Sequence, residues 1–324
     1  MKISVKWLSF LFLVVVIASC RKNKGSEPPP NPPDTSIVEY PLADPPSSIG
    51  FEHRNGTSYN INFDYSVAGQ VNVKFNEQPA IRYTYADGYL QEVQYLNNAG
   101  NNAGKFTVQR SGNTINRVIV EHIDPITAVS AKDTMNVTFS GSAENTKMTV
   151  NGKYFTGIPV TVDYTYKNDL LKEIKGGEFG ASVFLQSYQF TYDDKNRLAL
   201  RTSDAYYGAS YVYGDAAGSG LDSLYMVLGG KDRHFLEGIM FYDEYLSVFF
   251  YPLQIVLEDV GIELDAAVHR YGALREVRTV PNGAEYPDIS VFTIQNTFDS
   301  QKRVLTSRVT RKGSEFFANY TITY

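Results

Sequence analysis

The chain has 324 residues, 43% of them hydrophobic, and a formal net charge of −5 at pH 7. No basic patch stands out in the sequence, so we do not expect nucleic acid as a partner. The single cysteine, Cys20, excludes disulfides within the chain and zinc sites built on several thiolates.

Residues 1–19 have the pattern of a bacterial lipoprotein signal peptide. Lys2 and Lys6 form a basic end, residues 8–18 are mostly apolar, and Ile17-Ala18-Ser19-Cys20 matches a lipobox. The apolar run is too short to cross a bilayer as a helix of the mature protein. We expect cleavage before Cys20 and attachment of lipid to its thiol. The alternative is an ordinary secretory signal followed by an unrelated cysteine.

Residues 20–50 are predicted to be a disordered tether. Pro28-Pro29-Pro30, Pro32-Pro33 and Pro45-Pro46 favour extended polyproline geometry. Such a segment would hold a folded domain away from the membrane that carries the lipid.

Residues 51–324 are predicted to form one all-β domain. Tyr188, Phe190 and Tyr192 alternate with polar residues, a turn of Asp193 to Asn196 follows, and Leu198 restarts the alternation. Similar strand–turn–strand units recur along the chain, for example around Asp87-Gly88 and around Asp299. We therefore expect a long antiparallel meander that forms a strongly curved sheet or a barrel-like structure.

One short helix is predicted near residues 252–268. Leu253, Val256, Leu257 and Val260 fit helical spacing, and Pro252 suits a first helical turn. The alternative is one more pair of strands, because Phe249, Tyr251, Leu253 and Ile255 also alternate.

The form Tyr-Asp-x-x-x-Arg-Leu at residues 192–198 resembles the YD-type β-hairpin repeat. Over residues 60–324 the chain resembles uncharacterised Bacteroidota lipoproteins whose domain of unknown function has a porin-like fold. A second point of similarity is Tyr251-Pro252-Leu253 followed by the segment 269–275, although Tyr251 replaces the usual Asn. The resemblance implies a fold and an envelope location, and no activity. Surface lipoproteins of this group often carry acidic residues after the cysteine, whereas Arg21-Lys22-Asn23-Lys24 is basic. This favours the periplasmic face of the outer membrane over the cell surface.

The sequence contains no recognisable catalytic motif. The four histidines, His53, His122, His234 and His269, have no metal-ligand spacing, and no nucleotide-binding glycine loop is present. Acidic pairs such as Asp193-Asp194 are explained by turns. We expect no catalytic residues, no cofactor and no metal.

Two three-residue patterns resemble the O-glycosylation sequon of the same bacterial group. They centre on Thr134 and Ser223, and each is expected to lie on an exposed loop.

The 24 tyrosines have two interpretations. They can pack across the sheet with the hydroxyl in water, or they can line a face that binds a ligand. Our leading hypothesis is a non-catalytic, lipid-anchored binding or scaffold protein. Its Tyr-rich sheet face would meet a glycan, a peptide or an envelope protein.

Two alternatives remain open. An outer-membrane integral β-barrel is suggested by the alternating Tyr320, Ile322 and Tyr324, but Arg303, Arg308 and Arg311 fall on both faces of one strand. A hydrolase of envelope polysaccharide or peptide would need converging carboxylates.

Overall fold

The structure is a computed structural model of the chain. It describes residues 44–53, 56, 58–123, 130–142, 144–153, 159–168, 170–176, 187–203, 208–214, 221–232, 254–257, 262–265, 273–280, 290–313 and 318–324. The predicted signal peptide, Cys20 and most of the predicted tether lie outside the described residues.

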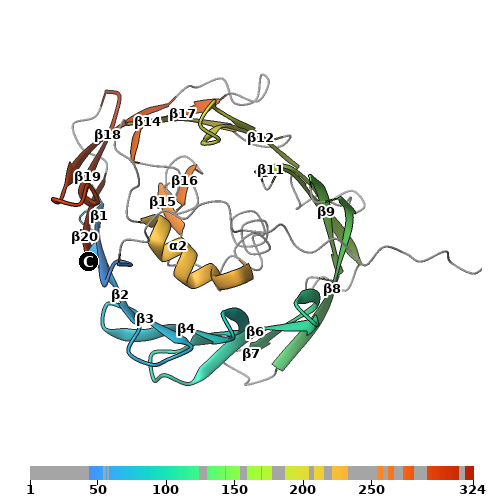
Figure 1. Ribbon diagram of the computed structural model, residues 1–324. Coiled ribbons are helices and arrows are strands. Elements are labelled where there is room, and N and C mark those ends of the chain that lie inside the picture. The colour runs from blue at the N-terminus through green and yellow to red at the C-terminus, as the bar shows by residue number, and fades with distance from the viewer. Residues whose placement is uncertain are drawn as a thin grey trace, which may run out of the picture.

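Eighteen strands form one antiparallel sheet that closes into a ring (Figure 1). They are β1 (Ser48–His53), β2 (Ser58–Asp64), β3 (Gln70–Phe75), β4 (Gln78–Ala86), β5 (Tyr89–Leu96), β6 (Asn102–Ser111), β7 (Thr114–Ile123), β8 (Ser130–Ser142), β9 (Asn145–Gly152), β10 (Val160–Lys167), β11 (Leu170–Lys175), β12 (Tyr188–Tyr192), β13 (Leu198–Ser203), β14 (Gly208–Tyr213), β17 (Leu274–Val280), β18 (Val291–Phe298), β19 (Val304–Arg311) and β20 (Ala318–Thr323). Successive strands of the ring are paired, and β1 also pairs with β20. The predicted all-β meander is confirmed, and it closes as a barrel.

The first strand begins earlier than predicted. The expected boundary at residue 51 falls inside β1, and the backbone amide of Ser47 already donates to the Thr323 carbonyl at 2.7 Å. Tyr65 Oη donates to the Pro46 carbonyl at 2.8 Å, so the second proline pair is tied to the barrel. The folded domain therefore begins several residues before the predicted boundary, and the prediction for residues 20–43 lies outside the described residues.

The described parts of the segment between β14 and β17 lie inside the ring. The segment contains α2 (Leu221–Gly229), the 3₁₀ turn η1 (Gly230–Asp232), and the strands β15 (Gln254–Leu257) and β16 (Ile262–Asp265), which Figure 1 shows inside the barrel. A ring of eighteen strands spaced ~4.8 Å apart and tilted by ~40° has a diameter on the order of 35 Å. Side chains of the wall alone cannot fill that width, so an inserted segment supplies part of the core.

The short helix lies elsewhere than predicted. In the described part of residues 252–268, β15 and β16 pair antiparallel, so the helix prediction there is wrong and the alternative strand pair is confirmed. Ile255, Val256 and Ile262 are β-branched, which favours the strand over the helix that the leucine spacing suggested. The helix is α2, and its Leu224 and Leu228 are fully buried on one face.

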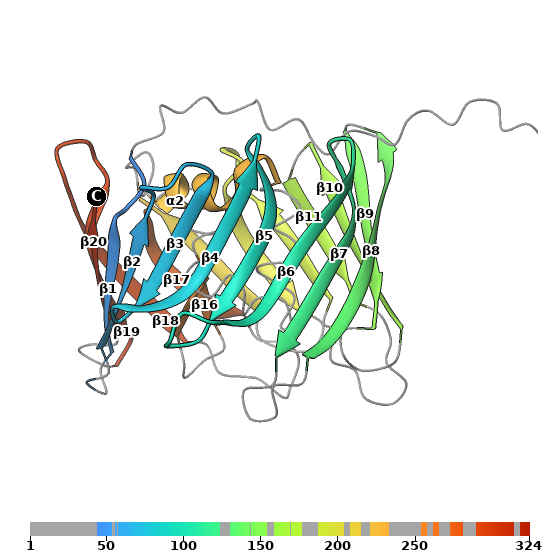
Figure 2. The same cartoon turned by 90° about the horizontal axis from the view of Figure 1, so that it is seen from below.

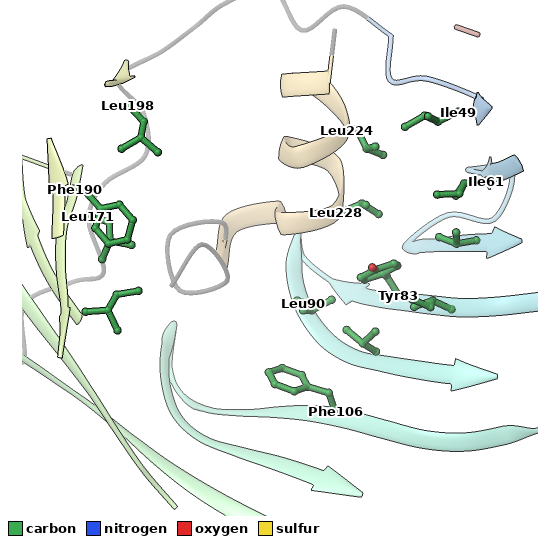
Figure 3. Packing of buried hydrophobic residues seen from close by; sticks show 14 of the residues in the cluster. Ile49, Ile61, Tyr83, Leu90, Phe106, Leu171, Phe190, Leu198, Leu224 and Leu228 are labelled. Carbon is green, nitrogen blue, oxygen red and sulfur yellow. The ribbon is translucent and has the colours of Figure 1, made fainter. Parts of the chain in front are cut away.

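Alternation along the strands separates an apolar inner surface from a polar outer surface. In β9, for example, Met148 and Val150 are buried, whereas Lys147 and Asn151 are exposed. Figure 3 shows wall residues such as Tyr83, Leu90 and Phe106 lying around Leu224 and Leu228 of α2. The apolar set therefore points into the barrel.

Two hairpin turns show the geometry of the predicted repeat. Asp193 and Asp299 each accept hydrogen bonds from backbone amides two and four residues further on, and from Nε of the arginine four residues further on. Asn196 and Lys302 adopt positive φ of 57° and 65° at the same position of each turn. The Asp-x-x-x-Arg spacing thus closes the hairpin, because one carboxylate satisfies both the turn amides and the guanidinium.

Candidate functional site

The outer surface of the barrel is polar on every side that the described strands cover. The large hydrophobic side chains exposed among the described residues are Val67, Tyr95, Val212 and Phe298, which lie apart on different strands or turns. A membrane-spanning barrel shows the reverse arrangement, with an apolar band outside and a polar interior. Within the described part of the chain, no helix is both long enough and apolar enough to span a bilayer.

A hollow of about 740 Å³ lies where the first and last strands of the ring meet, over β18, β19, β20, β1 and β2. We call it the seam hollow. Its exposed lining residues alternate with the buried Phe51 and Tyr320, which places them on the outer face. Figure 2 shows β1, β2, β19 and β20 grouped at one side of the barrel.

Two cross-strand rows build the seam hollow. One row runs across the five strands in register and consists of Gln295, Arg308, Asn319, Glu52 and Ser58. The second row lies beside it and consists of Thr297, Thr306, Thr321, Gly50 and Asn60. The first row carries one guanidinium and one carboxylate, and all other side chains in both rows are small or neutral and polar.

Hydrogen bonds hold parts of both rows. Thr297 Oγ1 and Thr306 Oγ1 lie 2.7 Å apart, and Asn319 Nδ2 donates to Glu52 Oε2 at 3.4 Å. The second row, from Thr297 to Asn60, offers hydroxyl groups, and we call it the floor row. The first row, from Gln295 to Ser58, offers amide and charged groups, and we call it the wall row. Such a surface can donate and accept hydrogen bonds along its whole length.

Gly50 lies in the floor of the seam hollow without a structural need for glycine. It is not among the described residues with positive φ, and a Cβ added there would lie 3.8 Å from Asn60 Oδ1 and from the Thr321 carbonyl, which is ordinary contact. Glycine inside a strand weakens it by about 0.5–1 kcal/mol relative to alanine. Its effect here is to leave this part of the hollow unfilled.

Aromatic rings on the inner face stiffen the wall behind the hollow. Phe51 stacks on Tyr59 with ring centroids 4.7 Å apart and lies tilted by 44° against Tyr320 at 4.9 Å, and Tyr59 stacks on Phe75 at 4.9 Å. Burial raises the pKa of Tyr320 well above its ordinary value, so its hydroxyl stays protonated. The outer rows therefore rest on a layer of packed aromatic rings.

A second cluster attaches the inserted helix to the wall. Asp232 of η1 accepts hydrogen bonds from the Leu90 amide and from Arg110 of β6, and both side chains of the ion pair are almost fully buried. Tyr85 Oη donates to the Leu228 carbonyl at 2.8 Å, which adds a contact from β4. Burial raises the pKa of Asp232, and the positive charge of Arg110 and the Leu90 amide oppose that rise. This cluster anchors the helix to the wall.

The predicted modification sites fall in different environments. Cys20 lies outside the described residues. Thr134 is exposed in β8, and Ser223 is 1% exposed on α2 inside the barrel, so the expectation of an exposed loop is wrong for both. The three-residue pattern carries no information about secondary structure or burial, so it could not predict that Thr134 lies in a strand and Ser223 in a buried part of a helix.

The Tyr-rich face points into the barrel and is not presented outside. Tyr83, Tyr164, Tyr166, Tyr211 and Tyr320 are all buried, so the expectation of an exposed Tyr-rich surface is wrong for them. Alternation shows which residues share a face, but it does not show which face meets water. Tyrosines near strand ends instead bond to backbone: Tyr213 Oη donates to the Leu198 carbonyl at 3.0 Å and Tyr324 Oη to the Val304 carbonyl at 3.2 Å.

Sequence reasoning missed the seam hollow. Its residues come from positions 50–60 and 295–321, together with Asn76, and only closure of the ring brings the first and last of these segments together. The one local signal was Gly50 inside a run that otherwise has strand character.

Comparison with known proteins gives a limited result. No protein-family model matches the chain, and no curated protein matches it. A solved porin-like protein from Bacteroides vulgatus has 8% sequence identity over 86% of this chain and 98% of that chain, with a TM-score of 0.40. A porin-like protein from Bacteroides uniformis has 11% identity over 86% of this chain and 97% of that chain, with a TM-score of 0.31. Neither similarity decides what this chain does.

Proposed function

We propose that this protein is a lipid-anchored barrel of the bacterial cell envelope that stands in water and binds a partner on its polar outer surface, without catalysis. The observation that carries the proposal is the polarity of the wall, which is apolar inside and polar outside. The lipid on Cys20 would supply the membrane attachment that the barrel surface does not offer.

The charged side chains on the outer face allow an estimate of the free-energy cost of placing this surface in a bilayer. Arg82, Lys105, Arg117, Lys147 and Arg308 all point outward from positions inside their strands, at least two residues from either strand end. An outward Lys or Arg at the middle of a bilayer costs about 2–4 kcal/mol. Five such residues would cost on the order of 10 kcal/mol, which is comparable to the total stability of a domain.

The proposed location is the outer membrane, with the periplasmic face favoured by the basic run after Cys20. The absence of catalysis is proposed from the seam hollow, whose lining contains one carboxylate, Glu52. Glycosidases need two converging carboxyl groups.

A membrane-spanning barrel is the second candidate, and closure of the ring favours it. Spanning requires that every backbone group be paired within the protein, and a closed ring of strands meets that requirement. In this case the outward polar side chains would have to lie in lipid.

Fractionation of the Cys20→Ala variant separates the two candidates. We expect the variant to be released into the soluble periplasmic fraction with its fold intact, while the wild-type protein stays with membranes. The comparison uses carbonate and urea washes, with a known integral barrel of the same cells as the reference. Variant protein that remains in washed membranes would refute the anchored barrel and support the spanning one.

A further inference from the structure

We infer that the seam hollow is a binding site for a neutral oligosaccharide. The inference rests on the proposed function, because the outer face must be in water for a ligand to reach it. It names the ligand class and the residues that the proposed function leaves open.

The first observation is the unfilled position at Gly50. Glycine in a strand interior often marks a place where a ligand or another backbone comes close. Here neither positive φ nor a clash requires glycine, since the nearest atoms to an added Cβ are 3.8 Å away. The missing side chain is the fourth of five positions in the floor row, between Thr321 and Asn60, where its absence keeps the hollow continuous across β20, β1 and β2.

The second observation concerns how much backbone the central strands offer to a partner. A peptide that adds a strand needs the unpaired backbone groups of a sheet edge. The three central strands under the hollow, β19, β20 and β1, are each paired on both sides at the lining residues. The outer two are not, since β18 pairs with β17 only over 291–293 and β2 pairs with β3 only over 61–64. Across these three central strands, recognition must therefore come from side chains.

The third observation is the chemistry of those side chains. Arg308 and Glu52 lie in one row with Asn319 between them, so the hollow has no net charge. The floor presents the hydroxyls of Thr297, Thr306 and Thr321. Alternating hydroxyl, amide and single charged groups match a ligand that carries many hydroxyls and no charge, because each sugar hydroxyl both donates and accepts.

The dimensions favour a chain over a single sugar. The hollow crosses five strands, and four spacings of ~4.8 Å give a length of about 19 Å. The rows run perpendicular to the strands, so an extended oligosaccharide would lie across β18 to β2 along the floor.

Affinity electrophoresis in native gels tests the inference on the full chain carrying Cys20→Ala. The probes are soluble starch, laminarin, mannan, inulin and xylan, with heparin as a polyanion. We expect at least one neutral polysaccharide to retard the protein and heparin not to retard it. Failure of all five neutral probes, or stronger retardation by heparin, would overturn the inference.

Two variants assign the binding to the hollow. Gly50→Val fills the floor and Thr306→Val removes one floor hydroxyl without changing its shape, and each should weaken binding by about tenfold or more. The control is Thr138→Val, an exposed residue of β8 outside the hollow, which should bind like the wild type. The unfolding midpoint of Gly50→Val should stay the same or rise, because valine suits a strand better than glycine. Unchanged binding by both hollow variants would overturn the inference. Membrane fractionation of Cys20→Ala is a separate result, so failure of the anchor and failure of the glycan site remain distinguishable.

Discussion

The buried ion pair between Asp232 and Arg110 allows a prediction of how much the free energy of unfolding changes when one partner is removed. The two side chains are 6% and 10% exposed, and Asp232 also accepts a 2.8 Å hydrogen bond from the Leu90 amide. The substitution Asp232→Asn keeps an oxygen for that amide and removes the charge. It leaves the Arg110 guanidinium buried without its counter-ion.

The expected cost of Asp232→Asn is about 3–5 kcal/mol in the free energy of unfolding, because removing one partner leaves an uncompensated buried charge. This is about a third of the 5–15 kcal/mol typical of a domain. Arg110→Met should cost a similar amount, since Asp232 would then be the unpaired charge. The double variant Arg110→Met/Asp232→Asn should cost far less than the sum, because it leaves no charge unpaired.

Urea unfolding followed by far-ultraviolet circular dichroism measures these differences in the lipid-free Cys20→Ala chain. The only tryptophan, Trp7, is in the predicted signal peptide, so tryptophan fluorescence is not a suitable signal. The control is Glu92→Gln with Lys105→Met, an outer pair with N···O of 3.1 Å and partial exposure, for which coupling should stay below about 1 kcal/mol. A cost below about 1 kcal/mol for Asp232→Asn, or additive costs in the double variant, would refute the reasoning.

Two further predictions concern the turns and the strand ends. Burial alone would raise the pKa of Asp299, but the hydrogen bonds from Arg303 and the turn amides outweigh burial and lower the pKa. The ionised Asp299 therefore stabilises the folded state above about pH 4, and this stabilisation is lost as pH falls through the lower pKa of the folded state. Asp299→Asn should therefore lower the thermal midpoint at pH 7 and lose most of that difference in strongly acidic buffer; a difference that does not depend on pH would contradict this assignment. Tyr213→Phe should lower the free energy of unfolding in urea by about 1–2 kcal/mol, because it leaves the buried Leu198 carbonyl without the Tyr213 hydroxyl as donor. Tyr324→Phe should cost less, because its hydrogen bond is more exposed. Equal costs would argue against burial as the cause.

Local signals in the sequence predict the hairpins well. The turn at Asp193 needs an acceptor at its first position, a residue that tolerates positive φ at Asn196 and an arginine at position 197, and all three are visible in the sequence. Alternation on both sides then predicts two strands that pair. The same local information is consistent with an open or a closed sheet, because closure depends on β1 reaching β20 across most of the chain.

Features that depend on which face meets water were not predictable. Alternating tyrosines share one face whether that face is inside or outside, and the structure places Tyr164 and Tyr166 inside. The helix at residues 221–229 is short, so its periodicity is weak, and its apolar face is decided by the barrel interior around it. Gly50 could be seen in the sequence, but its neighbours Thr321 and Thr306 in the hollow are more than 250 residues away along the chain.

The width of the barrel links the inserted segment to the polarity of the wall. A ring of eighteen strands encloses a space far wider than two opposing layers of side chains, so a barrel with an apolar lining must either enclose another apolar element or be filled by lipid-like material. Leu224 and Leu228 on α2 supply such an element, and Asp232 and Tyr85 fix its end to the wall. A water-filled pore would instead need a polar lining, which the described inner face does not have. The inserted segment after β14 and the apolar inner face therefore depend on each other, because the helix covers apolar side chains that would otherwise line an empty interior. The outer face can then carry polar groups such as those of the seam hollow.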